Sequence, residues 1–536
     1  MPDISRRRFL GGVAATTAVG LAATAGISRM ADATTTPATK GAPARMSVIN
    51  ERRRVVIIGS GFGGAVTALR LAQAGVQVLL LERGIRWPTG PNADTFARMF
   101  SPDQRCAWLS ISPTLTAIPP AVFLPYTGVI DRVKGNGVDI LCGAGYGGGS
   151  LVYHGMTLQP TEPLFAEVLP QLDYGELATT YYPRVASMLG IATIPDDVLN
   201  SPQYLSNQLF IKKIKAAGMT PSKIPMPIDW DYARAELRGD MKPSYTTGDV
   251  IYGVNNGGKH SLDVTYLAAA EATGLVEVAT LHVAEQIARN AQGKWVVSAN
   301  QIDTGGNTVA QKVITADAVF MGAGVAGTTR LLMRAQAKGT ITDLPEGLGT
   351  QMGTNGDRIF SWSGMSENSG ALQGGPACIG VKEWDNPSSA VTVVHGPIPI
   401  PIDAQLMSII GYGITPVRGS FAYNSTTDDV VLTYPHDTET DLNNAIKATI
   451  NKIIGLDGTL TDTTDSDATT FHALGGAPLG SVCDQYGRVQ GQRGLYVMDG
   501  SLIPGSTGAC NPSMTIAALA ERNLDTIVRT DLGKVF

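Results

Sequence analysis

The stretch RVVIIGSGFGGA, residues 54–65, decides the fold class of this chain. Its first five residues predict a buried strand, and the apolar spacing of residues 65–74 predicts a helix that ends at Gly75. A second buried strand follows at 76–81. Strand, glycine turn, helix and strand in this order predict the βαβ unit of an α/β, Rossmann-like dinucleotide-binding domain.

The glycines of this stretch are spaced as a phosphate-binding loop requires. Gly59 permits the tight turn, Gly61 lets a pyrophosphate approach the backbone, and Gly64 lets the helix meet the strand. Glu82 stands about 20 residues further on, where an acid accepts the adenosine ribose hydroxyls and disfavours a 2′-phosphate. Phe62, inside the loop, completes this set of candidate cofactor contacts.

Composition excludes several classes of protein. The 536 residues are enough for two intertwined domains, and only 16% of them are charged. The net charge of −5 argues against a nucleic-acid partner, which would need a basic face. We expect no metal site. The cysteines are scattered and odd in number, so we interpret them as buried thiols (Cys106, Cys142, Cys378, Cys483, Cys510).

The N-terminus has the pattern of a twin-arginine export signal. Paired arginines in SRRRFL, residues 5–10, precede a small-residue apolar stretch and the sequence Ala31-Asp32-Ala33. We expect residues 1–33 to be a cleaved signal peptide, residues 34–50 a linker, and the mature protein to be secreted. The alternative is a short membrane anchor, but the stretch lacks the Leu, Ile and Phe density of a spanning helix.

Three later segments favour FAD over NAD. The run 317–324 is a buried strand entering a second glycine loop, and 494–500 is another strand that ends in Asp499-Gly500. Between the first unit and these lies a long glycine run at 143–152.

With these segments the chain resembles the glucose-methanol-choline (GMC) oxidoreductases, and within them the flavoprotein cholesterol oxidases. The similarity runs from about Val55 to the C-terminus. Its motifs include GGGSLV at 147–152, KHSLD at 259–263, FHALGG at 471–476 and DGSLIPG at 499–505.

The resemblance implies two discontinuous domains. An FAD-binding domain would take residues 50–86, 259–349 and 487–536. An α+β substrate domain would take 87–258 and 350–486, with an antiparallel sheet over the flavin.

The resemblance also implies non-covalent FAD and a set of contacts to it. Asp499 and Gly500 would lie near the diphosphate and ribityl chain, Gly149 and Met156 along the isoalloxazine, and the Val283 backbone at the adenine. The family's usual Asn-Gly is Tyr153-His154 here. A covalent link through His154 is the alternative, but His154 lies further from Ser150 than in the covalent members of the family.

The resemblance assigns His472 and Asn511 to catalysis. Alcohol oxidation removes the hydroxyl proton and passes a hydride to the flavin, and histidine is suited to take the proton. An asparagine amide can hold the hydroxyl oxygen. We interpret His260, His282 and His436 as structural.

The substrate implied by the resemblance is a bulky apolar alcohol such as a sterol, oxidised at its 3-hydroxyl. The apolar, proline-rich segments 106–129 and 397–402 are candidates for the cavity wall; the alternative is ordinary packing. The family's glutamate for the ring double-bond shift is Val394 here, so isomerisation to the 4-en-3-one is in doubt. His395 is adjacent, but neighbours in a strand face opposite sides.

The leading interpretation is a secreted alcohol oxidase that passes electrons to O₂ and forms H₂O₂. One alternative is an oxidase or dehydrogenase of another bulky apolar alcohol; a dehydrogenase would pass the electrons to an acceptor other than O₂. Another alternative is a non-catalytic sterol-binding protein on a flavin fold. We expect a monomer, and a sterol substrate would imply transient contact with a membrane surface.

Overall fold

A computed structural model describes residues 47–115, 121–464 and 468–536. The predicted signal peptide 1–33 lies outside the described residues. Strand β1 (Ser47–Ile58) begins within the predicted linker 34–50, so the last four linker residues belong to the fold. Among the helices of the described part, none is long and apolar enough to cross a membrane. All five cysteines are free.

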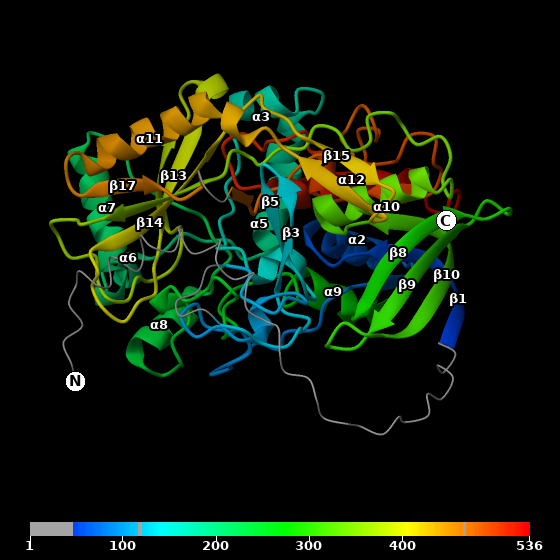
Figure 1. The fold of residues 1–536 in the computed structure, drawn as a ribbon, viewed down its shortest axis with the longest axis horizontal. Coiled ribbons are helices and arrows are strands. Elements are labelled where there is room, and N and C mark those ends of the chain that lie inside the picture. The colour runs from blue at the N-terminus through cyan, green and yellow to red at the C-terminus, as the bar shows by residue number, and fades with distance from the viewer. Residues whose placement is uncertain (1–46, 116–120, 465–467) are drawn as a thin grey trace, which may run out of the picture. The chain divides into compact units, whose positions relative to one another are not determined.

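The predicted βαβ unit is part of a seven-stranded sheet among the described residues, of which Figure 1 labels β8, β9, β10 and β1. Strand β1 pairs in parallel with β2 (Val78–Leu81) on one side and with β10 (Thr308–Met321) on the other. The remaining strands of this sheet are β7 (Val276–Ala279), β8 (His282–Arg289), β9 (Trp295–Ile302) and β19 (Leu495–Val497). Parallel pairing covered by helices explains why residues 55–58 and 78–81 are fully buried apolar runs.

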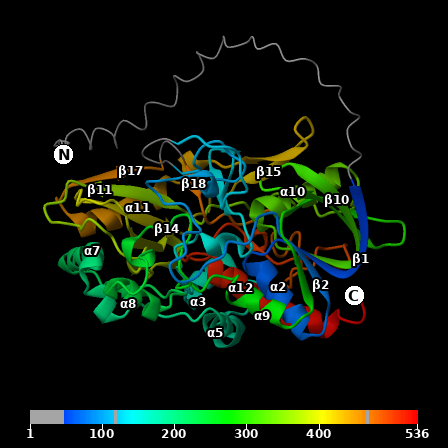
Figure 2. The ribbon, with the colours of Figure 1, turned by 90° about the horizontal axis from the view of Figure 1, so that it is seen from below.

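Helices from distant parts of the chain pack together on this sheet (Figure 2). Helix α2 (Phe62–Gln73) packs against α9 (Tyr266–Ala272) and α12 (Ser513–Thr530). Helix α10 (Gly324–Ala337) follows β10 directly and packs against β8. The last residues of β1, β10 and β19 are register partners, so the first glycine loop, which follows β1, lies where these three strands end.

A second sheet of six strands is antiparallel throughout. Its order is β17 (Thr459–Asp462), β11 (Arg358–Ser363), β14 (Leu406–Gly413), β13 (Val391–Gly396), β12 (Ile379–Glu383) and β6 (Ser222–Lys223). Helices α7 (Leu205–Ala216) and α11 (Thr440–Ile454) pack on it. A Cβ on Gly411 would lie 2.4 Å from Ile446 of α11, so Gly411 and its partner Val393 face this helix.

Two small sheets and several short helices complete the described fold. The small sheets consist of β15 (Ser420–Asn424), β16 (Asp429–Thr433) and β4 (Gly135–Asn136), and of β18 (Thr469–Thr470), β5 (Asp139–Gly143) and β3 (Ile130–Val133). The helices are α3 (Glu162–Val168), α4 (Tyr174–Glu176), α5 (Tyr182–Met188), α6 (Asp196–Leu199) and α8 (Trp230–Arg238).

Strands of the first sheet come from the segments assigned to the FAD domain, apart from the start of β1, and strands of the second sheet from those assigned to the substrate domain. The domain boundaries themselves stay a prediction.

Candidate active site

The glycines of the first loop divide into packed and open positions. Gly59 has φ +95°, and a Cβ on it would lie 2.3 Å from the carbonyl oxygen of Gly322. A Cβ on Gly64 would lie 1.9 Å from the carbonyl oxygen of Gly59. Around Gly61, in contrast, a Cβ would meet no heavy atom within 4 Å. Gly59 and Gly64 thus serve the turn and the helix contact, while Gly61 faces open space, as the predicted approach of a pyrophosphate requires.

This open position lies at the N-terminus of α2. Gly61 is the N-cap residue, makes no side-chain cap, and no acidic residue stands in the first turn. The first backbone N–H groups of the helix therefore remain available to an anion. Phe62, the first helical residue, packs edge-on against Tyr153, with ring centroids 5.6 Å apart.

The second glycine run meets this loop directly. Gly147 N donates to Ser60 Oγ at 3.0 Å. A Cβ on Gly148 would lie 2.8 Å from Gly61 Cα, whereas Gly149 has open space around it. Two glycine-rich segments far apart in sequence thus form one cradle with bare backbone at Gly61 and Gly149.

Glu82 lies at the end of β2, next to this cradle. Glu82 is 5% exposed, and its carboxylate accepts from Ser60 Oγ at 2.6 Å, from Ser60 N at 3.1 Å and from Gly84 N at 2.9 Å. The backbone N–H of His282 donates to Glu82 O at 2.9 Å, which brings Val283 close to Glu82. A carboxylate has about four acceptor positions, so Glu82 retains capacity for a ribose hydroxyl. These residues fit a dinucleotide.

The Asp499 carboxylate is fully used within the protein. It accepts from Gly324 N at 2.9 Å and Thr328 Oγ1 at 2.5 Å through Oδ2, and from the backbone and hydroxyl of Ser501 through Oδ1. Burial raises its pKa. Asp499 therefore joins the start of α10 to the turn at Gly500–Leu502. Contacts to a cofactor at this turn would come from Gly500 and the backbone, not from the Asp499 carboxylate.

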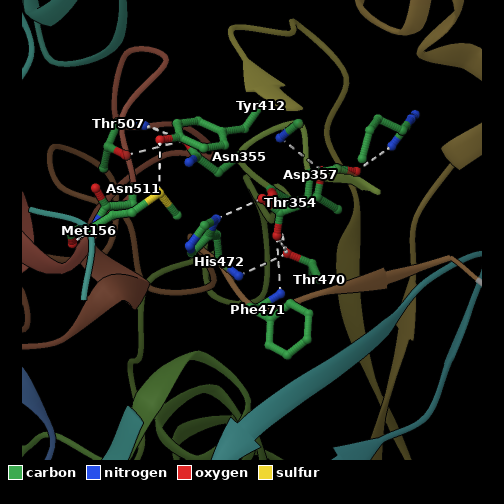
Figure 3. A network of polar contacts seen from close by, with 12 residues as sticks. Met156, Thr354, Asn355, Asp357, Tyr412, Thr470, Phe471, His472, Thr507 and Asn511 are labelled. Carbon is green, nitrogen blue, oxygen red and sulfur yellow. Dashed lines mark hydrogen bonds and ion pairs between the residues drawn. The ribbon is translucent and has the colours of Figure 1, made fainter. Parts of the chain in front are cut away.

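His472 is paired with a carboxylate that sequence reasoning missed (Figure 3). Its Nδ1 lies 2.6 Å from Asp357 Oδ1, and the Asp357 side chain is 5% exposed. The two residues are 115 positions apart, and no local motif connects them. The His472 ring packs edge-on against Tyr412, with centroids 5.8 Å apart.

Asn511 is tied to the loop that follows the second glycine run. Its Nδ2 donates to Met156 O and to Ser513 Oγ, and its Oδ1 accepts from Leu158 N at 3.0 Å. Both amide N–H groups are therefore used by the protein. Asn511 holds residues 156–158 in place, and its expected contact with a substrate oxygen stays a prediction. Tyr412 Oη donates to Met156 Sδ at 3.5 Å and so connects this group to His472.

Tyr153 and His154 form the part of this loop that departs from the family pattern. Lys259 Nζ donates to Leu151 O at 2.6 Å and to Tyr153 O at 3.1 Å, so a buried lysine fixes the loop. Burial lowers the pKa of Lys259 to about 7. Burial, and then Lys259 and His472, lower the pKa of His154 to about 4. His154 is thus a neutral imidazole within electrostatic range of His472.

The second sheet presents one face to this site and the other to helices. Thr392 Oγ1 donates to Ala509 O, and Tyr412, its register partner, contacts His472. Val394 lies on this same face and is fully buried. His395 faces the other way, its ring centroid 6.2 Å from that of Phe210 in α7. The pairing of β13 is regular, so no bulge turns His395 towards the site.

The expected apolar cavity wall needs correction in both segments. In segment 106–129, Val122 is 83% exposed and Leu124 is 78% exposed, and residues 116–120 lie outside the described part of the chain. In segment 397–402, Ile400 is buried but Ile402 is 50% exposed. These exposed side chains lie on the surface because their segments are loops without a covering layer.

Comparisons with known proteins fit this geometry. Family models described as GMC oxidoreductase, its C-terminal region and a NAD(P)-binding Rossmann-like domain match residues 434–520, 355–464 and 57–109. A cholesterol oxidase of Mycobacterium tuberculosis is 26% identical over 548 residues, covering 87% of this chain and 90% of that protein. One from Acinetobacter baumannii is 23% identical over 554 residues, covering 90% and 95%.

The chain thus matches the GMC oxidoreductase models over residues 355–520 and is similar to cholesterol oxidases over most of its length. It is an FAD-dependent alcohol oxidoreductase, and the cradle described above is where a GMC enzyme of this fold would hold FAD. Solved structures share the fold. Pyridoxine 4-oxidase superposes with a TM-score of 0.61 at 16% identity, covering 88% of this chain and 99% of that one. A fungal aryl-alcohol oxidase superposes with a TM-score of 0.61 at 13% identity, covering 89% and 99%.

Proposed function

We propose that this GMC enzyme oxidises the 3-hydroxyl of a sterol such as cholesterol to the ketone and passes the electrons to O₂, giving H₂O₂. The observation that carries the proposal is the Asp357–His472 pair beside Tyr412, because it holds Nδ1 of the imidazole and leaves Nε2 for a hydroxyl proton. The cholesterol oxidases that match most of the chain support the sterol and the oxygen acceptor.

In this mechanism the protein positions the alcohol and removes its proton. Asp357 holds Nδ1 of His472, which leaves Nε2 to accept the hydroxyl proton. Tyr412 packs against the imidazole and limits its rotation. Bound FAD supplies the acceptor for the carbinol hydride. Gly59, Gly61, Phe62, Gly64, Glu82, Gly149 and Val283 would hold it, with Gly500 and Met156 at the ring end.

The ring double-bond shift has no carboxylate base at the position expected for it. Val394 cannot take a proton, and His395 faces α7. We therefore propose that cholesterol is released largely as the unconjugated 5-en-3-one. Rapid appearance of the conjugated 4-en-3-one, followed by its ultraviolet absorbance, would contradict this.

A second candidate is an oxidase or dehydrogenase of another bulky alcohol. Two half-buried hydroxyls, Ser361 and Ser408, pair across the face of the sheet that carries Tyr412. They lie about 14 Å from Tyr412, because Ser408 is four residues away along the strand at roughly 3.4 Å each. This favours an alcohol with a distant second polar group. A 2-methyl-1,2-propanediol dehydrogenase of Mycolicibacterium austroafricanum also matches, 26% identical over 59% of this chain and 56% of that protein.

Anaerobic stopped-flow reduction of the flavin with sterols, terpenoid alcohols, steroid diols and sugars tests these alternatives. Saturable bleaching with cholesterol at the highest kcat/KM supports the sterol. Preference for a steroid diol favours the second candidate. Comparison of the H₂O₂ yield in air with dye reduction under nitrogen separates oxidase from dehydrogenase. Absence of bleaching with every alcohol would contradict both.

We also propose non-covalent FAD, twin-arginine export, a monomer and transient contact with a lipid surface. Release of free FAD on acid denaturation is the expected result for the first. Twin-arginine export predicts that an Arg6→Lys/Arg7→Lys variant is no longer exported. Light scattering tests whether the protein is a monomer, and co-sedimentation with cholesterol-containing vesicles tests the contact with a lipid surface.

A further inference from the structure

We infer that Asp357 is a positioning residue that fixes the tautomer of His472. It places the ring proton on Nδ1 and leaves Nε2 as the acceptor. This inference rests on the proposed function for its kinetic consequence. The tautomer itself is a property of the described residues.

The first step is the contact between the two side chains. Asp357 immediately precedes β11 of the six-stranded antiparallel sheet, and His472 follows β18 of a small mixed sheet, so the two sheets bring them together. An ionised carboxylate has no proton to donate. The ring nitrogen 2.6 Å from Oδ1 must therefore be the one that carries hydrogen, and in a neutral imidazole the other nitrogen is then an acceptor.

The second step is what holds the carboxylate. Asp357 Oδ2 accepts from Thr470 Oγ1 at 2.8 Å and from the backbone N–H of Phe471 at 3.1 Å (Figure 3). His472 N in turn donates to Thr470 Oγ1 at 3.0 Å. Residues 470–472 therefore surround the carboxylate, and each of its oxygens has a fixed task.

The third step is the consequence for an amide at this position. The Phe471 N–H can only donate, so Asp357→Asn must place its amide oxygen where Oδ2 is now. The NH₂ group then faces His472 Nδ1 and requires that nitrogen to accept. This reverses the tautomer and puts the proton on Nε2, where it blocks proton removal from an alcohol. Asp357→Ala has no such requirement, because it leaves the ring free to adopt either tautomer.

The ordering of two variants follows from this. Flavin reduction by the best alcohol should slow more in Asp357→Asn than in Asp357→Ala, although Asn is the closer replacement. We expect about 10³-fold or more for Asn, the scale on which an imposed wrong tautomer acts in a Ser-His-Asp triad. We expect about 10–100-fold for Ala, as for loss of an outer-shell partner. A merely structural role predicts the reverse order.

The deciding measurement is the ¹⁵N–¹H long-range spectrum of the FAD-loaded enzyme labelled with ¹⁵N-histidine. It is recorded at about pH 8.5, two units above the ordinary histidine pKa. His472→Gln identifies the signal. We expect the Nδ1–H tautomer in the wild type and the Nε2–H tautomer in Asp357→Asn. His260 is an internal control that should not change, since its Nδ1 lies 3.1 Å from Leu189 O.

An Nε2–H signal for His472 in the wild type overturns the inference, and this result needs no Asp357 variant to fold. So does an Nδ1–H signal in Asp357→Asn, or a folded, FAD-loaded Asp357→Ala that is slower than Asp357→Asn. If no alcohol bleaches the wild-type flavin, the proposed function fails, whereas the tautomer measurement still decides the inference.

Discussion

At the scale of single residues, His395 is a titratable side chain enclosed by the core. Neither ring nitrogen has a hydrogen-bond partner among the described residues, and the residue is fully buried. Burial lowers the pKa of His395 to about 3. Its position in the helix-facing side of β13 gives it no part in the site, so its cost to stability is not offset by a catalytic contact.

We expect His395→Leu to stabilise the protein by about 1–3 kcal/mol, because two unpaired buried polar atoms are removed. Below pH 6.5 His395 binds a proton in the unfolded wild type, whereas in the folded protein it stays neutral until the pH approaches about 3. The free energy of unfolding of the wild type therefore falls as the pH decreases over this range. The variant should lose less over this window. Denaturant unfolding at several pH values checks this. A variant with slower flavin reduction would contradict the placement of His395 outside the site.

Gly61 and Gly64 provide a matched pair of substitutions in one loop. Gly61 has φ −68° and open space around a Cβ, so Gly61→Ala should fold normally. Its methyl group would occupy the space that a pyrophosphate needs, and we expect the Kd for FAD to rise at least tenfold, about 1.4 kcal/mol. Gly64→Ala should instead destabilise the fold, because its Cβ would lie 1.9 Å from a backbone oxygen. FAD titration of the apoprotein and thermal unfolding separate the two effects. Equal Kd values for wild type and Gly61→Ala would contradict a pyrophosphate at this loop.

At the scale of elements, β13 decides which side chains reach the site. Val391, Val393 and His395 face the helices, while Thr392 and Val394 face the site, and the strand has no bulge to change this alternation. A base for a second proton transfer could therefore enter only at the site-facing positions.

We expect Val394→Glu to accelerate conversion of the 5-en-3-one to the 4-en-3-one, because it places a carboxylate on the site-facing side of β13. Its register partner Gly380 carries no side chain, and a Cβ there would lie 2.7 Å from Val394 Cγ1, so the residue at 394 packs directly on the backbone of β12. Val394→Gln is the control of equal size without a proton acceptor. The rate of enone absorbance with added 5-en-3-one measures the step without the oxidation. Equal rates in the Glu and Gln variants would contradict the placement.

At the scale of the whole molecule, one buried carboxylate joins four helices. Glu521 of α12 is fully buried and accepts from Arg70 of α2 at 2.6 Å, Tyr266 of α9 at 2.8 Å and Arg184 of α5 at 3.2 Å. Arg184 belongs to the predicted substrate domain and the others to the predicted FAD domain. This cluster therefore links the two predicted domains, and none of its residues belongs to the group around His472.

We expect Glu521→Gln to lower the free energy of unfolding by about 3 kcal/mol, the lower end for breaking a buried ion pair, since it leaves the partly buried Arg70 without its counter-charge whereas Arg184 keeps Asp525. Flavin reduction should keep its rate constant at temperatures where the variant is folded. Asp197→Asn is the control, because its pair with Arg234 is exposed to solvent and should contribute much less to stability than a buried pair. A loss in Glu521→Gln no larger than in the control would show that the cluster does not hold the helices together.

Local sequence determined the βαβ unit, the glycine roles and the strand alternation at Val394 and His395. Each of these follows from spacing within about 30 residues, and backbone geometry converts such spacing directly into position. The order of motifs along the chain also led to the family and to FAD, which the comparisons support.

Tertiary structure alone decided which distant groups meet. Three contacts join residues that no local sequence pattern relates. They are the Asp357–His472 pair, the contact of Gly148 with Gly61, and the hydrogen bonds of the Asn511 amide to Met156 and Ser513. The surface location of Val122 and Leu124 was likewise missed, because apolar composition does not say whether another layer covers a loop. Local spacing thus determined the cofactor fold, and only the packing of distant segments decided how the histidine is held for its chemistry.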